Sequence, residues 1–235
     1  MHETKFAWII SAIHLEETKL KLKFAFAIFL IVLFGLLTLT VHLRLWESFD
    51  WDSLQAIQNA VPRMADLPAS LLSIVGSAEV TGLIFLALLI LAQPAQRLPW
   101  FITFGAATLV EFVGKTWVNQ PTTPEELVRY VRLFPLFSGG INPGYSFPSG
   151  HATRTIFILI VLASMISTSH LNRFAKCILY AGLVLFEVVM LLSRVYLAEH
   201  WLTDVIGGAL LGAAFALVAL GWEIPLPKFF AQKTL

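Results

Sequence analysis

Long apolar runs are the feature of this sequence that most limits how the chain can fold. Residues 24–41 and residues 205–222 contain no charged side chain. Four further runs each carry a single Lys, Arg, Asp or Glu: residues 67–92, 98–114, 151–169 and 177–192. A helix needs roughly 20 apolar residues to cross a bilayer. We therefore predict an all-α integral membrane protein with six transmembrane helices.

The composition excludes several other classes of protein. Charged residues make up 13% of the 235 residues and hydrophobic residues 57%, whereas an average soluble domain has about 25% charged residues. The formal net charge of +1 gives no basic excess for binding nucleic acid. The only cysteine, Cys177, excludes an intramolecular disulfide and a cysteine-based zinc site.

Basic residues in the loops predict the orientation of the spans. Placing both termini in the cytoplasm puts nine Lys and Arg residues inside and four outside, if three at outer helix ends are set aside. Inner loops of membrane proteins carry the excess of basic residues. We expect a cytoplasmic N-terminal segment over residues 1–23, one six-helix domain over residues 24–222, and a cytoplasmic tail over residues 223–235.

Two outer segments have the pattern of short interfacial helices. Residues 51–61 place Leu54, Ile57 and Val61 on one face. Thr123, Pro124 and Glu126 form the signature of a helix start, which predicts a helix over residues 123–134. On the inner side, residues 6–13 favour either a helix lying on the membrane surface or a frayed tail.

Polar side chains gather at the outer ends of the third to sixth spans. Odd-numbered spans end outside and even-numbered spans begin there, so these groups reach one interface. They are Lys115 at the end of the third span, Ser149-Gly150-His151 at the start of the fourth, Arg194 at the end of the fifth, and His200 and Asp204 at the start of the sixth.

These residues carry a family resemblance. The sequence resembles the type 2 phosphatidic acid phosphatase family of integral membrane lipid phosphatases, over roughly residues 50–220. Its Pro-Ser-Gly-His motif is present at Pro148-Ser149-Gly150-His151. Its Ser-Arg-x5-His-x3-Asp motif is present at Ser193-Arg194, His200 and Asp204, with both spacings intact.

The family's remaining motif, Lys-x6-Arg-Pro, is only half present. Lys115 begins it, but Thr122-Thr123 stand where the family has Arg-Pro. The run of residues 115–121 is similar to the bacterial type B phosphatidylglycerophosphate phosphatases, which also accept undecaprenyl diphosphate. Arg129, Arg132 or Arg154 could replace the missing guanidinium. Arg154 lies about one helical turn after His151 and can face the same side.

The resemblance implies a role for each of the catalytic residues. His200 would attack the phosphorus and form a phosphohistidine. Asp204, four residues later, would accept the proton on one ring nitrogen of His200 and leave the other free. His151 would protonate the leaving alkoxide and then activate water.

The same resemblance implies how the phosphate is bound. Lys115 and Arg194 would neutralise the phosphate oxygens. Ser149 and Gly150, at the start of a helix, would offer a hydroxyl and backbone N–H groups to the anion. We expect no cofactor and no metal site, because basic side chains supply the positive charge.

Two of the carboxylates within the predicted spans are Glu111 and Glu187. Glu111 is four residues before Lys115, so we expect a structural ion pair between them. For Glu187 a hydrogen bond within the helical bundle is favoured over a role in holding a cation of the site.

These inferences predict a membrane lipid phosphatase, in the cytoplasmic membrane, with its site on the outer side. Its substrate would be phosphatidylglycerophosphate, phosphatidic acid or undecaprenyl diphosphate. Two alternatives remain: a lipid phosphotransferase using the same intermediate, and a non-catalytic lipid-binding or transport protein. No nucleic-acid partner is expected, and the sequence leaves the oligomeric state open.

Overall fold

Helices form all the regular structure in the part of the chain that the computed structural model describes, residues 2–131 and 144–222. In chain order they are α1 (His2–His42), α2 (Glu47–Ala60), the 3₁₀ turn η1 (Arg63–Ala65), α3 (Asp66–Gly76), α4 (Ala78–Leu91), α5 (Pro94–Trp117), the 3₁₀ turn η2 (Glu125–Leu127), α6 (Gly150–Thr168), α7 (Arg173–Tyr196) and α8 (Leu202–Gly221).

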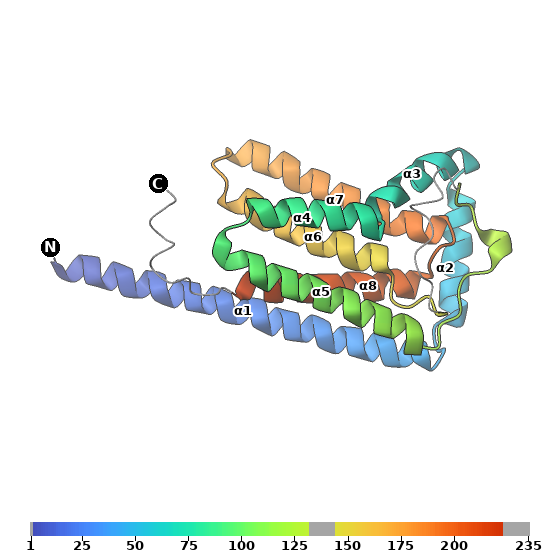
Figure 1. Ribbon diagram of the computed structural model, residues 1–235, viewed down its shortest axis with the longest axis horizontal. Helices are drawn as coiled ribbons and strands as arrows, with labels where there is room; N and C mark the ends of the chain where they lie inside the picture. The colour runs from blue at the N-terminus through green and yellow to red at the C-terminus, as the bar shows by residue number, and fades with distance from the viewer. Residues whose placement is uncertain (1, 132–143, 223–235) are drawn as a thin grey trace.

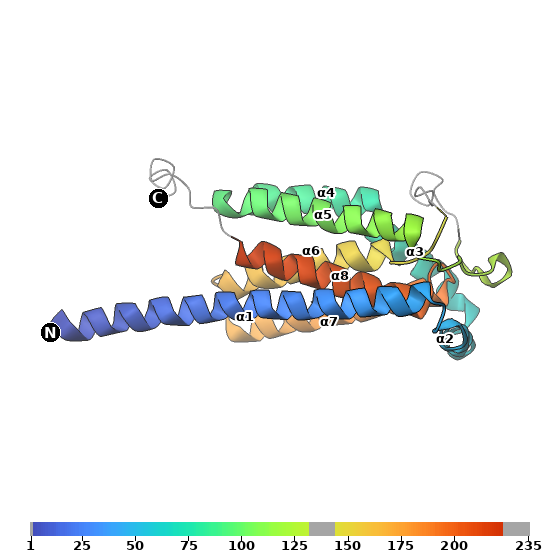
Figure 2. The ribbon, with the colours of Figure 1, turned by 90° about the horizontal axis from the view of Figure 1, so that it is seen from below.

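Helices α1, α4, α5, α6, α7 and α8 run along the long axis of the molecule, and α2 lies across one end of them (Figure 1). Seen from below, α4 and α5 form one layer, α6 and α8 a middle layer, and α1 and α7 a third (Figure 2). We call the end of the bundle that carries α2 the α2 end. The N-terminus of α1 and the C-terminal end of α8 lie toward the opposite end (Figure 1).

Four of the described helices are long and apolar enough to cross a membrane: Glu17–His42 within α1, α6, α7 and α8. Residues Arg63–Gly76 and Ala78–Leu91 make a fifth if they are taken as one bent span. α5 runs beside them but carries Arg97, Glu111 and Lys115, and it is not among these helices. The all-helical membrane fold is thus confirmed, while the count of six spans and their orientation remain predictions.

The second apolar run, residues 67–92, is divided into two helices rather than forming one. The axes of its two halves differ by 49°. Ser77 is extended and its Oγ accepts a hydrogen bond from Val80 N at 3.3 Å, which caps α4. A Cβ built on Gly76 would lie 2.6 Å from the His151 ring, so the break lets the end of α3 approach the start of α6 closely.

One of the two predicted interfacial helices is present, and the prediction of the other is wrong. α2 confirms the helix predicted over residues 51–61, starting a turn earlier and with Leu54 buried. Within the described part of residues 123–134 there is only η2. The hydroxyl of Thr123 does not cap a helix there, because it donates to Ala198 O. Arg129 N donates to Leu197 O at 3.1 Å and Val131 N to Ser70 Oγ at 2.9 Å, so these amides are paired outside a helix.

The N-terminal part of the chain continues α1 without a break. Residues 2–23, which the sequence set apart from the first span, belong to the same helix as residues 24–41. Lys23 Nζ donates to Leu220 O at 3.1 Å, so α1 is joined to the last turn of α8. Residues 223–235, predicted to be a cytoplasmic tail, lie outside the described residues.

Glycines in α8 allow the middle layer to pack closely. A Cβ built on Gly208 would lie 2.3 Å from Ser149 O, and one on Gly212 would lie 2.3 Å from Thr153 O. Small residues spaced four apart let two helices approach closely within a membrane. There van der Waals packing, and not the hydrophobic effect, drives helix association. α8 therefore fixes the start of α6.

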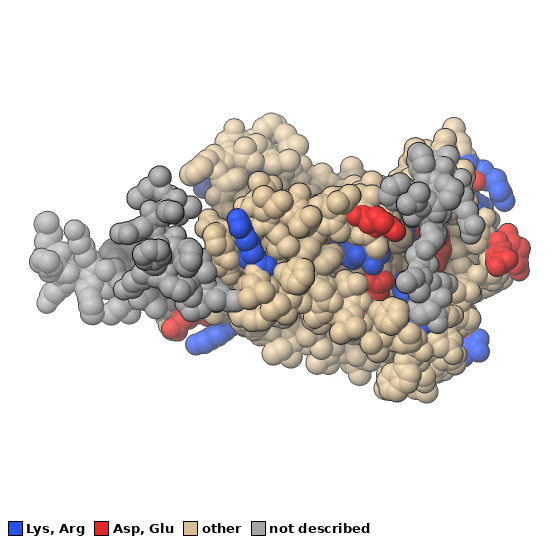
Figure 3. Space-filling model, viewed as in Figure 1, with Lys and Arg blue, Asp and Glu red and all other residues tan. Residues whose placement is uncertain are grey.

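Apolar side chains cover the outside of the bundle. Phe26, Ile28 and Phe29 of α1 and Val184 and Leu185 of α7 are all exposed. In the space-filling view most of the surface along the flank is uncharged, and many of the visible charges lie toward the α2 end (Figure 3). This is the distribution expected where the flank contacts lipid and the ends contact water.

Candidate active site

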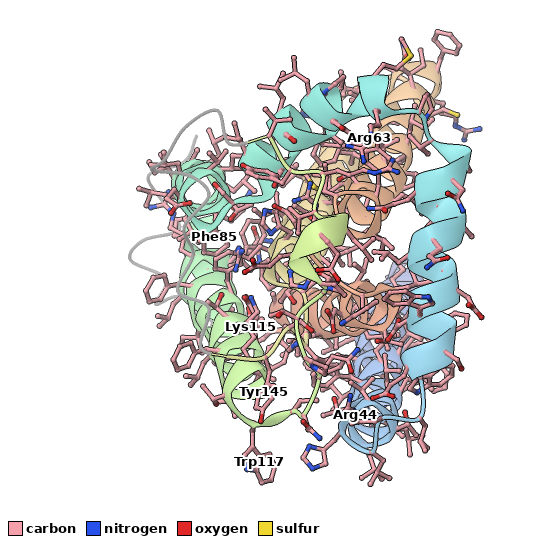
Figure 4. All side chains as sticks on the ribbon, turned by 90° about the vertical axis from the view of Figure 1, so that its right-hand side faces the viewer. Arg44, Arg63, Phe85, Lys115, Trp117 and Tyr145 are labelled. Atoms are coloured by element: carbon pink, nitrogen blue, oxygen red, sulfur yellow. The ribbon has the colours of Figure 1, made fainter. Side chains whose placement is uncertain are left out.

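The predicted site residues come from four helix ends that meet at the α2 end. α5 and α7 finish there, and α6 and α8 begin there (Figures 1 and 2). Figure 4 looks onto this end and labels Lys115 at the close of α5. Ser73 contacts both His151 and Arg194, and Glu111 contacts both Lys115 and Arg154. The helix ends thus form one cationic cluster around that histidine.

His200 and Asp204 form a buried pair. His200 Nδ1 lies 3.3 Å from Asp204 Oδ2, which also accepts the Trp201 amide at 3.0 Å. Asp204 is fully buried, and its Oδ1 has no hydrogen-bond partner among the described residues. If Nδ1 carries the proton shared with Asp204, the ring presents its Nε2 lone pair. The four-residue spacing at the start of α8 produces this contact.

A second buried carboxylate fixes the start of α8. Asp50 Oδ1 accepts the Thr203 amide at 2.9 Å, and its Oδ2 accepts the Thr203 hydroxyl at 2.6 Å and Gln120 Nε2 at 3.0 Å. Burial raises the pKa of Asp50 above its usual value. Asp50 was not identified from the sequence, where it resembles the exposed acids Glu47 and Asp52 of the same helix.

Arg194 is fully buried and bound on several sides. It donates to Ser73 Oγ and to the carboxylate of Glu199, and its Nη2 donates to Ser193 Oγ at 2.9 Å. These contacts fix the plane of the guanidinium beside the start of α6. Glu199 lies five residues along the chain from Arg194, but no motif or spacing in the sequence singled it out.

Ser73 links Arg194 to His151. His151 Nε2 lies 3.1 Å from Ser73 O and 3.4 Å from Ser73 Oγ, and the same hydroxyl accepts from Arg194. Ser73 lies on α3, whose approach depends on the break after Gly76. Sequence reasoning missed Ser73, since it lies 121 residues from Arg194 and in an apolar run.

Glu111 joins two cations at the end of α5. Its Oε1 lies 3.1 Å from Lys115 Nζ, which confirms the predicted ion pair, and its Oε2 lies 2.8 Å from Arg154 Nη1. A Cβ built on Gly150 would lie 2.0 Å from Glu111 Oε1. The carboxylate therefore lies directly against the first residue of α6.

Ser149 lies at the N-cap of α6 without capping it through its side chain. Its hydroxyl is fully buried and has no partner in the described part of the chain. Its amide donates to Asp204 O at 2.9 Å, which holds the starts of α6 and α8 together. The free hydroxyl lies at a helix N-terminus, where anions are favoured.

Of the two described arginines considered as replacements for the missing one, Arg154 pairs with Glu111 beside Lys115, whereas Arg129 makes its contacts elsewhere. Arg129 donates to Gln58 O and Val61 O and lies over the Tyr196 ring, 5.1 Å from its centroid. It therefore supports the loops around α2. Arg132 lies outside the described residues. Thr122, where the family has arginine, is exposed.

Glu187 makes the bundle hydrogen bond that the sequence favoured. Thr155 Oγ1 donates to its Oε1 at 2.9 Å. Within the described chain, no group of three or more His, Cys, Asp or Glu side chains could hold a metal ion.

Comparison with known proteins identifies the family. The PAP2 superfamily matches residues 96–225, more than half of the chain. The chain belongs to the PAP2 superfamily. This match confirms the family that the two complete motifs indicated, and it spans Lys115, His151, Arg194, His200 and Asp204.

One curated relative is phosphatidylglycerophosphatase B of Bacillus subtilis (strain 168). It is 29% identical over 133 residues, which cover 54% of this chain and 58% of that protein. The chain thus matches less than two thirds of this relative's length.

Two solved structures share the fold. One is the first transmembrane PAP2 type phosphatidylglycerolphosphate phosphatase from Bacillus subtilis, with a TM-score of 0.64 and 20% identity over 89% of this chain and 97% of that one. The other is Aquifex aeolicus LpxE, with a TM-score of 0.53 and 26% identity over 72% of this chain and 93% of that one. The long apolar helices and these relatives make the chain an integral membrane protein.

Proposed function

We propose that this protein is a metal-independent membrane lipid phosphatase that works through a phosphohistidine on His200. The observation that carries the proposal is the His200–Asp204 pair, 3.3 Å apart. It lies in a cluster that also contains His151 and three basic side chains. A histidine with one nitrogen held by a buried carboxylate is prepared to attack with the other.

The first step is attack of His200 Nε2 on phosphorus. The bond from phosphorus to the lipid oxygen breaks, and His151 gives its proton to the leaving oxygen. The Ser73 carbonyl, 3.1 Å from His151 Nε2, orients the ring for this transfer. In the second step His151 takes a proton from water, the hydroxide attacks the phosphohistidine, and phosphate leaves.

Charge on the transferred phosphoryl group is stabilised by fixed cations. Arg194 enters the site already oriented by Ser73, Ser193 and Glu199, so little reorganisation accompanies the reaction. Lys115, the buried hydroxyl of Ser149 and the Gly150 end of α6 complete the phosphate site. Arg154 is the nearest replacement for the arginine missing at Thr122.

A lipid substrate is supported by an apolar cavity beside Arg194. The cavity has a volume of about 490 Å³ and lies between α2, α3 and α7. Ala69 and Ser193 line it, and both also accept hydrogen bonds from Arg194. A hydrocarbon chain in this cavity would leave its phosphate at the guanidinium. A relative's name supports phosphatidylglycerophosphate; phosphatidic acid and undecaprenyl diphosphate are the other substrates we propose.

The proposed setting is the cytoplasmic membrane, with both termini inside and the α2 end facing the periplasm or the cell exterior. The six-span arrangement, with α3 and α4 as one broken span and α5 as another, is part of this proposal. The excess of basic residues in the predicted inner loops supports it.

The test is phosphate release from a panel of lipid phosphates by the purified protein in detergent, with His200→Ala as control. We expect release from at least one lipid, abolished in the variant. Release that requires an added acceptor lipid would instead identify a phosphotransferase. No release from any lipid, with His200→Ala unchanged in lipid binding, would favour the non-catalytic alternative.

A further inference from the structure

The corner of the site formed by α5 and α6 is already occupied by an anion from the chain itself. Glu111 contacts Lys115 at 3.1 Å and Arg154 at 2.8 Å. Its Oε1 also lies against Gly150, 2.0 Å from where a Cβ would be. The three groups that a phosphate would meet at this corner, two cations and the start of α6, are all in contact with one carboxylate.

We propose that Glu111 is an internal counter-anion that substrate phosphate displaces from Lys115 and Arg154, and that returns to them when inorganic phosphate leaves. This inference rests on the proposed function, since it concerns how the same site binds and releases phosphate. Glu111 is a positioning residue in this scheme, because it acts through the two cations and not on the reacting atoms.

Two buried polar atoms at this corner lack partners and support an exchange of anions. Arg154 is 9% exposed, and its Nε has no hydrogen-bond partner among the described residues. The fully buried hydroxyl of Ser149 is also without one in this part of the chain. Buried polar atoms are normally satisfied. A phosphate has more acceptor oxygens than a carboxylate and could serve these donors together with Lys115.

Electrostatics supports displacement over joint binding. A phosphate dianion next to an ionised carboxylate would repel it strongly at short range, even in a polar protein environment. Both anions gain from the same two cations. The carboxylate therefore keeps Lys115 and Arg154 together in the empty site and competes with phosphate for them.

The experiment measures how Glu111→Gln changes the binding of inorganic phosphate and orthovanadate. Removing the competing anion should lower the inhibition constants of both by on the order of tenfold, the scale of one charge in a partly screened site. KM for the lipid should fall, and kcat should fall too because phosphate leaves more slowly. Arg154→Gln should have the opposite effect on the inhibition constants.

Glu187→Gln is the matched control. It removes the charge of another buried carboxylate, one that accepts from Thr155 and contacts no basic side chain in the described chain. Its inhibition constants should equal those of the wild type. If Glu111→Gln leaves the constants unchanged or raises them, the counter-anion role is wrong and Glu111 only supports the structure.

A second comparison covers the case in which Glu111→Gln does not fold. The double variant E111Q/R154Q should bind phosphate more tightly than Arg154→Gln alone, and equal or weaker binding would overturn the proposal. Thermal stabilisation of the purified protein by inorganic phosphate reports binding without turnover. It therefore separates failure of this inference from failure of the phosphatase activity itself.

Discussion

At the scale of single residues, the candidate site contains paired side chains at the ends of α5, α6 and α8. The His200–Asp204 and Glu111–Lys115 pairs are four residues apart and follow from helical spacing. The pair between Glu111 and Arg154 joins residues 43 apart. Such a contact depends on how α5 meets α6, which no local spacing specifies.

Asp204→Asn should lower kcat by about 100-fold or more while KM changes little. The amide can still accept from the Trp201 amide, but it does not stabilise the positive charge that develops on His200. Steady-state kinetics on the most active lipid of the panel measures this. Asp50→Asn, which changes the other buried carboxyl group at the start of α8, should keep most of kcat. If both variants lose kcat equally, Asp204 acts only by holding the helix.

Ser73→Ala should reduce kcat/KM by about tenfold and shift the pH profile of kcat/KM. The variant loses a hydroxyl that accepts from Arg194, and hydrogen bonds to charged groups contribute about 1.5–3 kcal/mol. Ser77→Ala, which loses the cap of α4, should lower the melting temperature with little effect on kcat/KM. An unchanged pH profile in Ser73→Ala would show that the Ser73 hydroxyl does not position His151.

At the scale of elements, apolar runs predict where helices are, but not where they break or stop. The division follows Gly76, which packs against His151, a residue far away in the sequence, and Ser73 of the same helix contacts His151 too. The helix predicted from Thr123 fails for a similar reason. The Thr123 hydroxyl, which would have capped that helix, donates to Ala198 O, and the Arg129 amide, which would have lain within it, donates to Leu197 O.

Gly208→Ala should destabilise the protein by about 1–3 kcal/mol, the usual cost of overpacking a core. Its new methyl group would lie 2.3 Å from Ser149 O and force α8 away from the start of α6. Gly182→Ala in α7 is the control, because a Cβ there meets no atom within 4 Å among the described residues. It should raise stability slightly, by up to about 1 kcal/mol. Thermal unfolding in detergent compares the two, and equal melting temperatures would contradict close packing at Gly208.

At the scale of the whole molecule, apolar flanks and a charged end fit a membrane protein that contacts lipid on its sides, and we propose that its chemistry takes place at the charged end. The low charged fraction predicted this class directly. Six spans, their orientation and the lipid substrate go beyond what the helices establish and remain proposals. The cationic cluster is the feature that joins fold to the proposed function, because in that proposal it takes the place of a metal in neutralising phosphate.

Activity should therefore survive a metal chelator and be inhibited by orthovanadate, which mimics the phosphoryl group in its transition state. Phosphate release with and without chelator tests this. Complete loss of activity in chelator, reversed by magnesium, would mean that Lys115, Arg194 and Arg154 do not suffice.

The most direct test of the account is to trap the covalent intermediate. Brief reaction with a lipid labelled in its phosphate, followed by denaturing quench, should give protein-bound label that is labile in acid and stable in base. The label should map to His200, accumulate in His151→Ala if any turnover remains, and be absent in His200→Ala. Turnover by the wild type with no label on His200, or turnover that survives His200→Ala, would contradict the phosphohistidine mechanism.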